Sequence, residues 1–401
     1  MRPIRKLIQL DEALRIIDSA ASPVDGTERL PLVDASDRVC AEDVVSSTSV
    51  PPFSRAAMDG YAVRARDTFG ASRANPVVLR VREKLYAGSV PKKVIGRGEC
   101  SEIATGAMMP KGADAVVMVE DTETAGSEVT VNESLHPGKN TSKKGEDIAP
   151  RTRLVSRGEL LNPSKIGALA AVGLDSVKVY RRPRVAVVTT GDEIAELGAR
   201  LKPGQVYNIN SYTVSAAVRA NGGEARILPI AKDTMGDLER VVDECEDCDI
   251  LVFSGGSSVG ERDIMLDLLE HRGEVLFHGI AVKPGKPTLF GTIGSRLLFG
   301  MPGYPTSCLS NAYMLLVPTV RRMARLPERE PASVVARMSK RVVSATGRTQ
   351  FLTVRLEGGL AIPAFKESGA ITSMSHAEGY VIIPADVDLI ENGEQVRVFL
   401  L

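Results

Sequence analysis

Short apolar strands alternate with helices between residues 181 and 326, and this alternation restricts the fold more than any other feature of the chain. The β-branched run Arg184–Thr189 predicts a buried strand. Further strands are expected at 224–231, 249–254, 274–282 and 296–300, with helices at 211–220, 233–245, 263–271 and 302–323. Strands alternating with helices at this spacing predict a doubly wound parallel sheet with helices on both faces.

The flanking segments follow different patterns. Short β-type runs broken by Gly and Pro precede the α/β segment, and strands and turns alone follow it. Helical periodicity at 10–20 and 156–172 suggests two segments that pack together. The expected fold is multidomain α/β plus β, with a discontinuous helical domain (1–26 and 146–180, with part of 40–52), a β-rich domain (27–145), an α/β domain (181–328) and a C-terminal small β-barrel, or alternatively a sandwich (332–401).

The composition argues against several classes of protein. The 50 basic residues balance 50 acidic ones, so no net charge favours nucleic acid, and the absence of Trp argues against base-stacking platforms. No apolar stretch approaches the ~18–20 residues of a membrane span, and the N-terminus lacks a signal-peptide core. We therefore expect no nucleic-acid or membrane partner and a cytoplasmic location.

Cysteine usage favours reduced thiols, because five cysteines are an odd number spread over a long chain. Cys245 and Cys248 form a CxxC in an acidic run near an expected helix end. Zinc would require two further ligands, and the remaining cysteines and four histidines form no partner pair. We therefore favour two reduced thiols without a function here, and a metal or redox role for the pair remains an alternative.

In open α/β sheets, ligands bind beyond the carboxyl ends of the strands, so the residues there are the first candidates for a site. The Gly- and Ser-rich loop 254–260 stands between an expected strand and an expected helix. Its backbone N–H groups, small hydroxyls and helix dipole suit a phosphate, although a tight turn without a ligand is the alternative. The candidate anion-binding residues here are Ser254, Gly255, Gly256, Ser257, Ser258 and Gly260, with Pro302 and Gly303 after a neighbouring strand.

The motif KPGKP (283–287) places Lys283 and Lys286 on either side of a tight turn. A solvated hairpin tip is the alternative interpretation. The local charge favours a site: residues 275–326 contain six Lys and Arg and no Asp or Glu, whereas 232–274 contain 13 acidic and four basic residues. The neutral sum of the chain thus conceals a separation of sign that suits an anion held together with its metal ion.

Glu193, Asp233 and Asp263 follow three different expected strands. Mg²⁺ uses one or two carboxylates plus phosphate oxygens, so this set is a candidate metal site for a phosphorylated ligand. For Asp233 and Asp263 taken singly, helix capping is the preferred alternative, because both stand at expected helix starts.

Three turn-rich motifs lie outside the α/β segment: PPFSRAAMDGYAV (51–63), ATGAMMPKGADAVV (104–117) and GKNTSKKGED (138–147). From their chemistry alone they are surface turns. In order along the chain, these stretches and RPRVAVVTTGDE (182–193), GQVYNINSY (204–212), DILVFSGGSSVGERD (249–263), KPGKP (283–287) and MPGYPTSC (301–308) resemble the molybdopterin molybdenumtransferase (MoeA) family, to which the E domain of gephyrin is related.

The resemblance implies four domains, an elongated homodimer with a shared cleft, and the last step of molybdenum cofactor assembly. In that step, adenylylated molybdopterin and molybdate bind, the phosphoanhydride is cleaved with Mg²⁺, AMP leaves and the metal enters the dithiolene. The α/β domain would bind molybdopterin through residues 254–260 and 302–303, and Lys283 and Lys286 would neutralise the diphosphate. The resemblance also implies these roles: Glu193, Asp233 and Asp263 hold Mg²⁺ or order water; Asp59, Thr105 and Asp147 approach from the partner subunit; Arg348 or Arg355, with Ser368, helps receive molybdate.

The sequence departs from the family pattern at Ser54 and Arg55, at Tyr304, where the family commonly has Asn, and at Gly279, where some relatives have Lys. The Tyr304 departure affects the expected shape of the phosphate pocket. The alternatives are a tungstate-inserting paralogue, a non-catalytic molybdopterin-binding scaffold and a molybdopterin adenylyltransferase. An adenylyltransferase of the same pathway is also a candidate partner.

Overall fold

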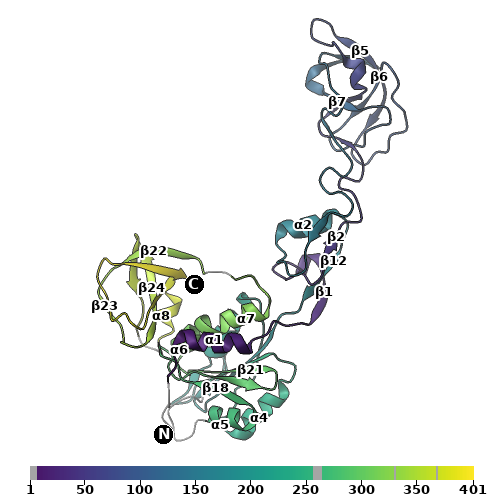
Figure 1. The fold of residues 1–401 in the computed structure, drawn as a ribbon. Coiled ribbons are helices and arrows are strands. Elements are labelled where there is room, and N and C mark those ends of the chain that lie inside the picture. Colours follow the sequence, from purple (N-terminus) through teal and green to yellow (C-terminus); the bar gives the residue numbers. More distant parts are fainter. Residues whose placement is uncertain (1–6, 256–263, 329–330, 367–368) are drawn as a thin grey trace. The chain divides into compact units, whose positions relative to one another are not determined.

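The computed structural model (Figure 1) describes residues 7–255, 264–328, 331–366 and 369–401. The chain divides into two compact units. Unit 1 contains residues 1–28, 37–39 and 179–401, and unit 2 contains 29–36 and 40–178. None of the helices in these described ranges is long and apolar enough to cross a membrane.

Unit 1 is built on a mixed sheet in the order β16-β13-β17-β21-β20-β18. Its strands are β13 (Arg184–Thr189), β16 (Glu224–Ile227), β17 (Ile250–Ser254), β18 (Glu274–His278), β20 (Leu289–Ile293) and β21 (Arg296–Met301). The expected parallel arrangement is confirmed for β16, β13, β17 and β21. It is wrong for β20, which pairs antiparallel with both β21 and β18.

Strand β20 is absent from the expected strand set because a turn at Gly294 and Ser295 joins it directly to β21 without a helix. Gly294 has a φ of 59°, which suits such a hairpin turn. Since β20 is antiparallel to both neighbours, β18 runs in the same direction as β21. The loop that follows β18 therefore starts at the same sheet edge as the loops that follow β13, β17 and β21.

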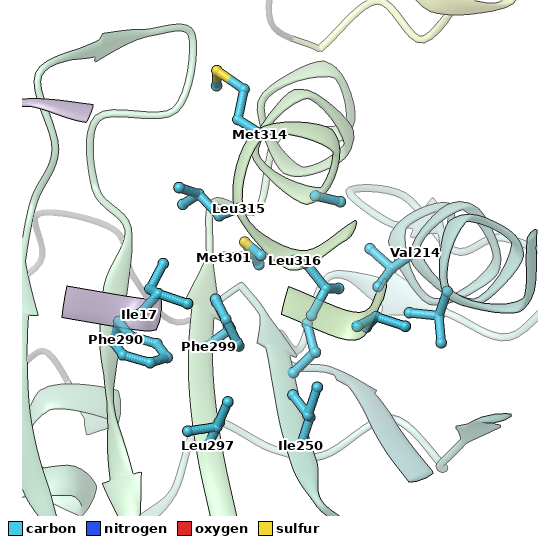
Figure 2. Packing of buried hydrophobic residues seen from close by; sticks show 14 of the residues in the cluster. Ile17, Val214, Ile250, Phe290, Leu297, Phe299, Met301, Met314, Leu315 and Leu316 are labelled. Atoms are coloured by element: carbon cyan, nitrogen blue, oxygen red, sulfur yellow. The ribbon is translucent and has the colours of Figure 1, made fainter. Parts of the chain in front are cut away.

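Helices cover both faces of this sheet. One face packs against α1 (Leu10–Ala20), α3 (Asn210–Ala220), α6 (Pro305–Asn311), the π-helical segment η4 (Ala312–Leu316) and α7 (Val317–Met323). The other face packs against α4 (Met235–Glu244) and α5 (Ile264–Arg272). Successive strand residues alternate between the faces, as Val187 and Val188 show by joining different clusters. Figure 2 shows the first cluster, with Phe299 and Ile250 beneath Leu316 and Val214.

The expected long helix at 302–323 is interrupted by the π-helical turn. Pro318 follows this turn, and a proline lacks the N–H for an α-helical bond and crowds the carbonyl four residues earlier. A wider turn before Pro318 accommodates both effects. Helix α1 matches its expected bounds, but Ala13 and Ile17 lie in the core of unit 1, whereas α2 (Pro163–Ala171) belongs to unit 2. The expected packing of 10–20 against 156–172 stays a prediction.

The C-terminal part of unit 1 contains a closed five-stranded barrel. Strands β24, β25, β22, β28 and β26 follow one another, and β26 pairs back onto β24. The bounds in this part are β22 (Ser333–Met338), β23 (Val342–Val343), β24 (Thr349–Glu357), β25 (Leu360–Pro363), α8 (Thr372–Ser375), β26 (Gly379–Ile383), β27 (Leu389–Ile390) and β28 (Gln395–Leu400). Of the two expected alternatives, the barrel is present rather than the sandwich.

Unit 2 is built around a sheet in the order β7-β4-β6-β5-β9-β8. Its strands are β4 (Gly60–Val63), β5 (Val77–Leu85), β6 (Glu99–Ile103), β7 (Ala115–Met118), β8 (Thr122–Ala125) and β9 (Glu128–Val131). Its other elements are the pairs β2 (Val44–Val45) with β11 (Arg153–Val155) and β3 (Arg55–Ala56) with β10 (Thr141–Ser142), and the 3₁₀ turns η1 (Leu32–Asp34), η2 (Ala65–Thr68) and η3 (Val119–Asp121). Strand β1 (Thr27–Pro31) pairs with β12 (Ser176–Tyr180), and each of these two strands includes residues of both units. The β-rich character expected between the two helical patterns is present.

Substitution of Phe299 tests the importance of the unit 1 sheet. Its side chain is fully buried in β21, with a ring centroid 4.8 Å from that of Phe290. We expect Phe299→Ala to lower the free energy of unfolding by about 3–5 kcal/mol, because it removes a buried aromatic ring and leaves a cavity. Chemical denaturation followed by circular dichroism measures the change. The matched control is Phe69→Ala, since the Phe69 side chain is exposed; equal losses for both variants would contradict this account.

Candidate functional site

The carboxyl ends of β13, β17 and β21 meet at one edge of the unit 1 sheet. The N–H of Thr190 donates to the carbonyl oxygen of Ser254 at 2.9 Å, and the N–H of Gly255 donates to that of Met301 at 3.3 Å. Gly255 has a φ of 104°, and a Cβ there would collide with the carbonyl oxygen of Thr190. A Cβ on Gly303 would lie 3.6 Å from Gly255 Cα. Glycine at 255 thus lets the loop after β17 leave the sheet beside Gly303.

The expected phosphate-binding loop is described only at its start, by Ser254 and Gly255. Gly256, Ser257, Ser258 and Gly260 lie outside the described residues, as do Asp263 and Ser368. Of the other expected contacts, Pro302 is buried and Gly303 is exposed at the end of β21.

A buried polar network holds the start of this loop. The Oγ1 atom of Thr189 lies 2.9 Å from Asn208 Oδ1, 2.8 Å from Ser211 Oγ and 3.1 Å from Ser254 Oγ. Asn208 Nδ2 also donates to Ser211 Oγ at 3.1 Å. All four side chains are buried, so their hydrogen bonds strongly restrict the positions that they adopt.

Two further buried oxygen atoms next to this network have no hydrogen-bond partner among the described residues: Thr190 Oγ1 and Asn210 Oδ1. The amide Nδ2 of Asn210 donates to the carbonyl oxygen of Gly303 at 2.8 Å. Thr190 Oγ1 lies 3.0 Å from where a Cβ on Gly255 would be. Buried polar atoms are nearly always paired, so these two atoms beside the glycine turns are candidate ligand contacts.

The lysine loop starts from the same sheet edge, after β18. Its Gly285 has a φ of 107°, and a Cβ there would collide with the side-chain amide of Asn311. The carbonyl oxygen of Gly285 accepts hydrogen bonds from Asn311 Nδ2 at 2.9 Å and from Thr288 Oγ1 at 2.8 Å. Asn311 and Thr288 are fully buried, and Lys283 and Lys286 are half-buried. Asn311, the last residue of α6, thus holds the turn between the two lysines through its hydrogen bond to Gly285.

The barrel pairs with the lysine loop through its strand β24. Strand β19 (Val282–Lys283) pairs in parallel with the start of β24, where Lys283 is opposite Gln350. Arg348 precedes this paired segment and is half-buried. Arg355 is farther along the strand by roughly 23 Å and pairs with Glu357 at 3.4 Å. By its position along the chain, Arg348 is therefore nearer than Arg355 to the residues of β24 that pair with the lysine loop.

The departure at Tyr304 is also close to the barrel. Its side chain is exposed, and a Cβ on Gly369 would lie 3.7 Å from its ring. The hydroxyl of Thr306 donates to the carbonyl oxygen of Ala370 at 3.1 Å. Tyr304 thus stands between the end of β21 and a barrel segment. Gly279, another departure, has a φ of 98° and no side chain to place in the loop.

Glu193 and Asp233 follow neighbouring strands and are both exposed. The isolated bridge between Thr190 and Ala231 brings the starts of their two loops side by side. Capping does not account for Asp233, because Thr234 is the N-cap of α4 and accepts the hydrogen bond from Asp237 N. The described residues contain no group of three His, Cys, Asp or Glu side chains that would hold a metal. Two carboxylates nevertheless fit Mg²⁺, which takes the rest of its ligands from phosphate and water.

The three turn motifs outside the α/β segment come together in unit 2. Strand β3 of the first motif pairs with β10 of the third, and Arg55 forms a bridge with Met108 of the second. Asn140 Nδ2 donates to the carbonyl oxygen of Val116 at 2.9 Å. Asp147 is exposed, and its N–H donates to the carbonyl oxygen of Val50 at 3.1 Å. The three motifs, which lie tens of residues apart in the sequence, therefore contact one another and form one surface. Independent surface turns would make no such contacts.

Asp59 and Thr105 interact directly on this surface. Asp59 Oδ1 accepts hydrogen bonds from Thr105 N at 2.6 Å and from Thr105 Oγ1 at 2.9 Å. These two bonds stabilise the charged carboxylate and hold the pKa of Asp59 below its usual value. Asp59 also borders a cavity of about 230 Å³ whose lining includes Tyr61, Lys84 and Glu102.

The sequence interpretation missed the buried residues that support the site. Asn208, Asn210 and Ser211 belong to the motif GQVYNINSY, and their position at the start of a partly apolar helix was the available signal. For Asn311, the available signal was a polar amide side chain within the mostly apolar segment 308–317. Both signals are polar residues where a buried helix face is expected.

The pKa of Asp59 provides a test of its pairing with Thr105. We expect Thr105→Val to raise this pKa toward the ordinary aspartate value, because the hydroxyl donor is lost while the backbone N–H remains. Protonation on lowering the pH would then begin at a higher pH than in the parent protein. Carboxyl-carbon NMR titration measures the shift. Thr105→Ser, which retains a hydroxyl, is the matched control, and an unchanged pKa in the valine variant would contradict the pairing.

Substitution of Asn311 tests the support of the lysine loop. We expect Asn311→Ala to weaken the binding of inorganic pyrophosphate, because Gly285 loses a buried donor that holds the loop between the two lysines. Calorimetric titration measures the affinity, and Asn221→Ala, at the end of α3, is the control. Unchanged pyrophosphate affinity in folded Asn311→Ala would refute this positioning role.

Family models match three successive parts of the chain. The MoeA N-terminal region (domain I and II) matches residues 8–173, a probable molybdopterin-binding domain matches 186–322, and the MoeA C-terminal region (domain IV) matches 335–401. These matches contain all three turn motifs, both lysines and the barrel.

The chain is also similar over its whole length to known proteins. A putative molybdopterin biosynthesis protein of Methanocaldococcus jannaschii is 32% identical over 100% of both chains. A molybdopterin molybdenumtransferase of Staphylococcus aureus is 31% identical over 99% of this chain and 95% of its own length. A crystal structure of a molybdopterin biosynthesis MoeA protein from Pyrococcus horikoshii superposes with a TM-score of 0.85 at 43% identity, over 98% of this chain and 99% of the other. From the convergent site geometry, the three matched regions and these full-length relatives, the chain belongs to the MoeA family of molybdopterin molybdenumtransferases.

Proposed function

We propose that the protein inserts molybdate into adenylylated molybdopterin and releases AMP in molybdenum cofactor biosynthesis. The observation that carries this proposal is the loop with Lys283 and Lys286, which follows β18 from the sheet edge where β13, β17 and β21 end, while Arg348 precedes the β24 residues that pair with this loop. These cations suit a substrate with a diphosphate and an oxyanion. Gly255 and Gly303 leave room for a phosphate to approach the backbone.

The chain's own residues would bind and orient the substrate. The lysine loop would neutralise the diphosphate, with Asn311 and Thr288 maintaining the turn, and Arg348 would attract molybdate. Ser254–Gly260, Pro302 and Gly303 would hold the molybdopterin phosphate, and Ser368 would assist Arg348. Glu193 and Asp233, with Asp263, would hold Mg²⁺, which when bound supplies charge for the scissile phosphoanhydride.

The proposal includes a homodimer in which a second copy contributes its Asp59, Thr105 and Asp147. Its support is the single surface that the three motifs of these residues form in unit 2, together with the charged state of Asp59. We also propose that residues 181–328 and 332–401 are separate domains within unit 1, and that 27–145 form the β-rich domain of unit 2.

AMP release tests the function. Purified protein incubated with adenylylated molybdopterin, Mg²⁺ and molybdate is expected to release AMP, measured by chromatography. Glu193→Gln removes a carboxylate proposed to hold Mg²⁺ or order water, and we expect it to slow release by about 10²-fold or more. Glu196→Gln is the matched control, because Glu196 is exposed in the same segment.

The other outcomes of this assay correspond to the alternative functions. Substrate binding without AMP release would indicate a scaffold, and ATP consumption in the presence of free molybdopterin would indicate an adenylyltransferase. Competition between molybdate and tungstate at equal concentrations would identify the preferred oxyanion. Full activity of the Glu193→Gln variant would overturn the role of that residue without affecting the family assignment.

A further inference from the structure

A cysteine pair in unit 1 forms a site that the proposed reaction does not use. Cys245 is the C-cap residue of α4, and the N–H of Cys248 donates to its carbonyl oxygen at 3.0 Å. This turn places both thiols beside one cation. Arg226 Nη2, from strand β16, lies 3.3 Å from Cys245 Sγ and 3.6 Å from Cys248 Sγ.

The two thiols of this pair have unequal properties. A hydrogen bond from Cys248, together with the Arg226 guanidinium, lowers the pKa of Cys245 below the usual value of a thiol. The same hydrogen bond and burial raise the pKa of Cys248, which keeps its proton. Ionisation of the pair is thus favoured at Cys245 rather than at Cys248. This is the asymmetry of a dithiol with one attacking and one resolving sulfur.

The other three cysteines serve as a comparison, because they are also buried but have, among the described residues, no neighbouring cysteine and no arginine beside the sulfur. Burial raises the pKa of Cys100 and that of Cys308 to about 12, and it also raises the pKa of Cys40. All five cysteines are buried. Burial alone therefore does not produce the thiolate, which depends on the paired sulfur and on Arg226.

The charged groups around the pair come from three segments. Arg226 projects from β16, Asp247 belongs to the turn between the cysteines, and Arg184 comes from β13. Asp247 forms ion pairs with Arg226 at 3.3 Å and with Arg184 at 3.6 Å. The Arg226 side chain is 45% exposed, whereas Cys245 is fully buried and Cys248 is 5% exposed. An exposed side chain changes rotamer readily, so movement of Arg226 would admit a small oxidant to the sulfurs.

We propose that Cys245 and Cys248 form a redox-active dithiol that hydrogen peroxide and other small hydroperoxides oxidise to an intramolecular disulfide. The Cys245 thiolate attacks one peroxide oxygen; the S–O bond forms, the O–O bond breaks, and hydroxide leaves from hydrogen peroxide. Sulfur loses two electrons and becomes a sulfenic acid. Cys248 then attacks this sulfur, the S–S bond forms, the S–O bond breaks, and the departing hydroxyl takes the Cys248 proton as water.

Oxidation of the purified full-length protein by stoichiometric hydrogen peroxide tests the proposal. We expect free thiols to fall from five to three per chain, with a mass loss of two hydrogens localised to the peptide containing Cys245 and Cys248. Cys248→Ser is expected to stop at a sulfenic acid on Cys245 that dimedone labels. Cys245→Ser is expected to form no disulfide, and Cys308→Ser is the control that reacts like the parent protein.

The dependence on Arg226 distinguishes a tuned site from incidental proximity. We expect Arg226→Gln to slow the oxidation at neutral pH and to raise the pH midpoint of Cys245 alkylation by iodoacetamide, because the thiolate loses its cation. Circular dichroism establishes that the variant is folded. Loss of thiols spread evenly over all five cysteines, or no mass change at this peptide, would overturn the proposal. These readouts require neither molybdopterin nor AMP release, so they stand apart from the proposed catalytic function.

Discussion

The parallel pairing of β13, β17 and β21 is the interaction on which the candidate site depends. It brings three carboxyl ends to one edge, where Thr190, Gly255 and Gly303 approach one another closely. The strands that lead to this edge carry buried apolar side chains such as Val187, Ile250 and Phe299. The side chains at the strand ends are instead hydroxyls and amides that hydrogen-bond to one another. Any change in the register of these strands would separate the groups that are proposed to hold the phosphate.

Two further constraints extend this edge into a cationic surface. The hairpin of β20 and β21 makes β18 run in the same direction as β21, so the lysine loop begins beside the other loops. Pairing of β19 with β24 then places Gln350 opposite Lys283, and Arg348 precedes the paired residues of β24. The buried amide of Asn311 supports the turn between the lysines. Backbone pairing thus adds a barrel segment to a stretch of chain that is already basic in sequence, since residues 275–326 contain six Lys and Arg and no Asp or Glu.

Much of the α/β architecture was predictable because its signals are local. The β-branched run of β13, the glycines after α3 and the periodicity of α1 each lie within a short stretch, and all three elements are present. Strand β20 was missed because its hairpin has no intervening helix, and the π-helical turn before Pro318 was missed because the apolar run continues through it. Capping of α4 was assigned to Asp233, whereas the neighbouring Thr234 makes the bond; adjacent polar residues cannot be distinguished by type alone.

The sequence by itself determined the residue types of the site: the glycines at strand ends, the paired lysines, the carboxylates and the three turn motifs. Tertiary structure decided which of them meet. It joined the three motifs on one surface of unit 2, paired the lysine loop with the start of β24, and placed Arg226 beside Cys245 and Cys248. Local propensity depends on neighbours along the chain, whereas these contacts depend on strand register and helix packing between segments far apart in sequence. Their geometry therefore becomes visible only in the folded protein.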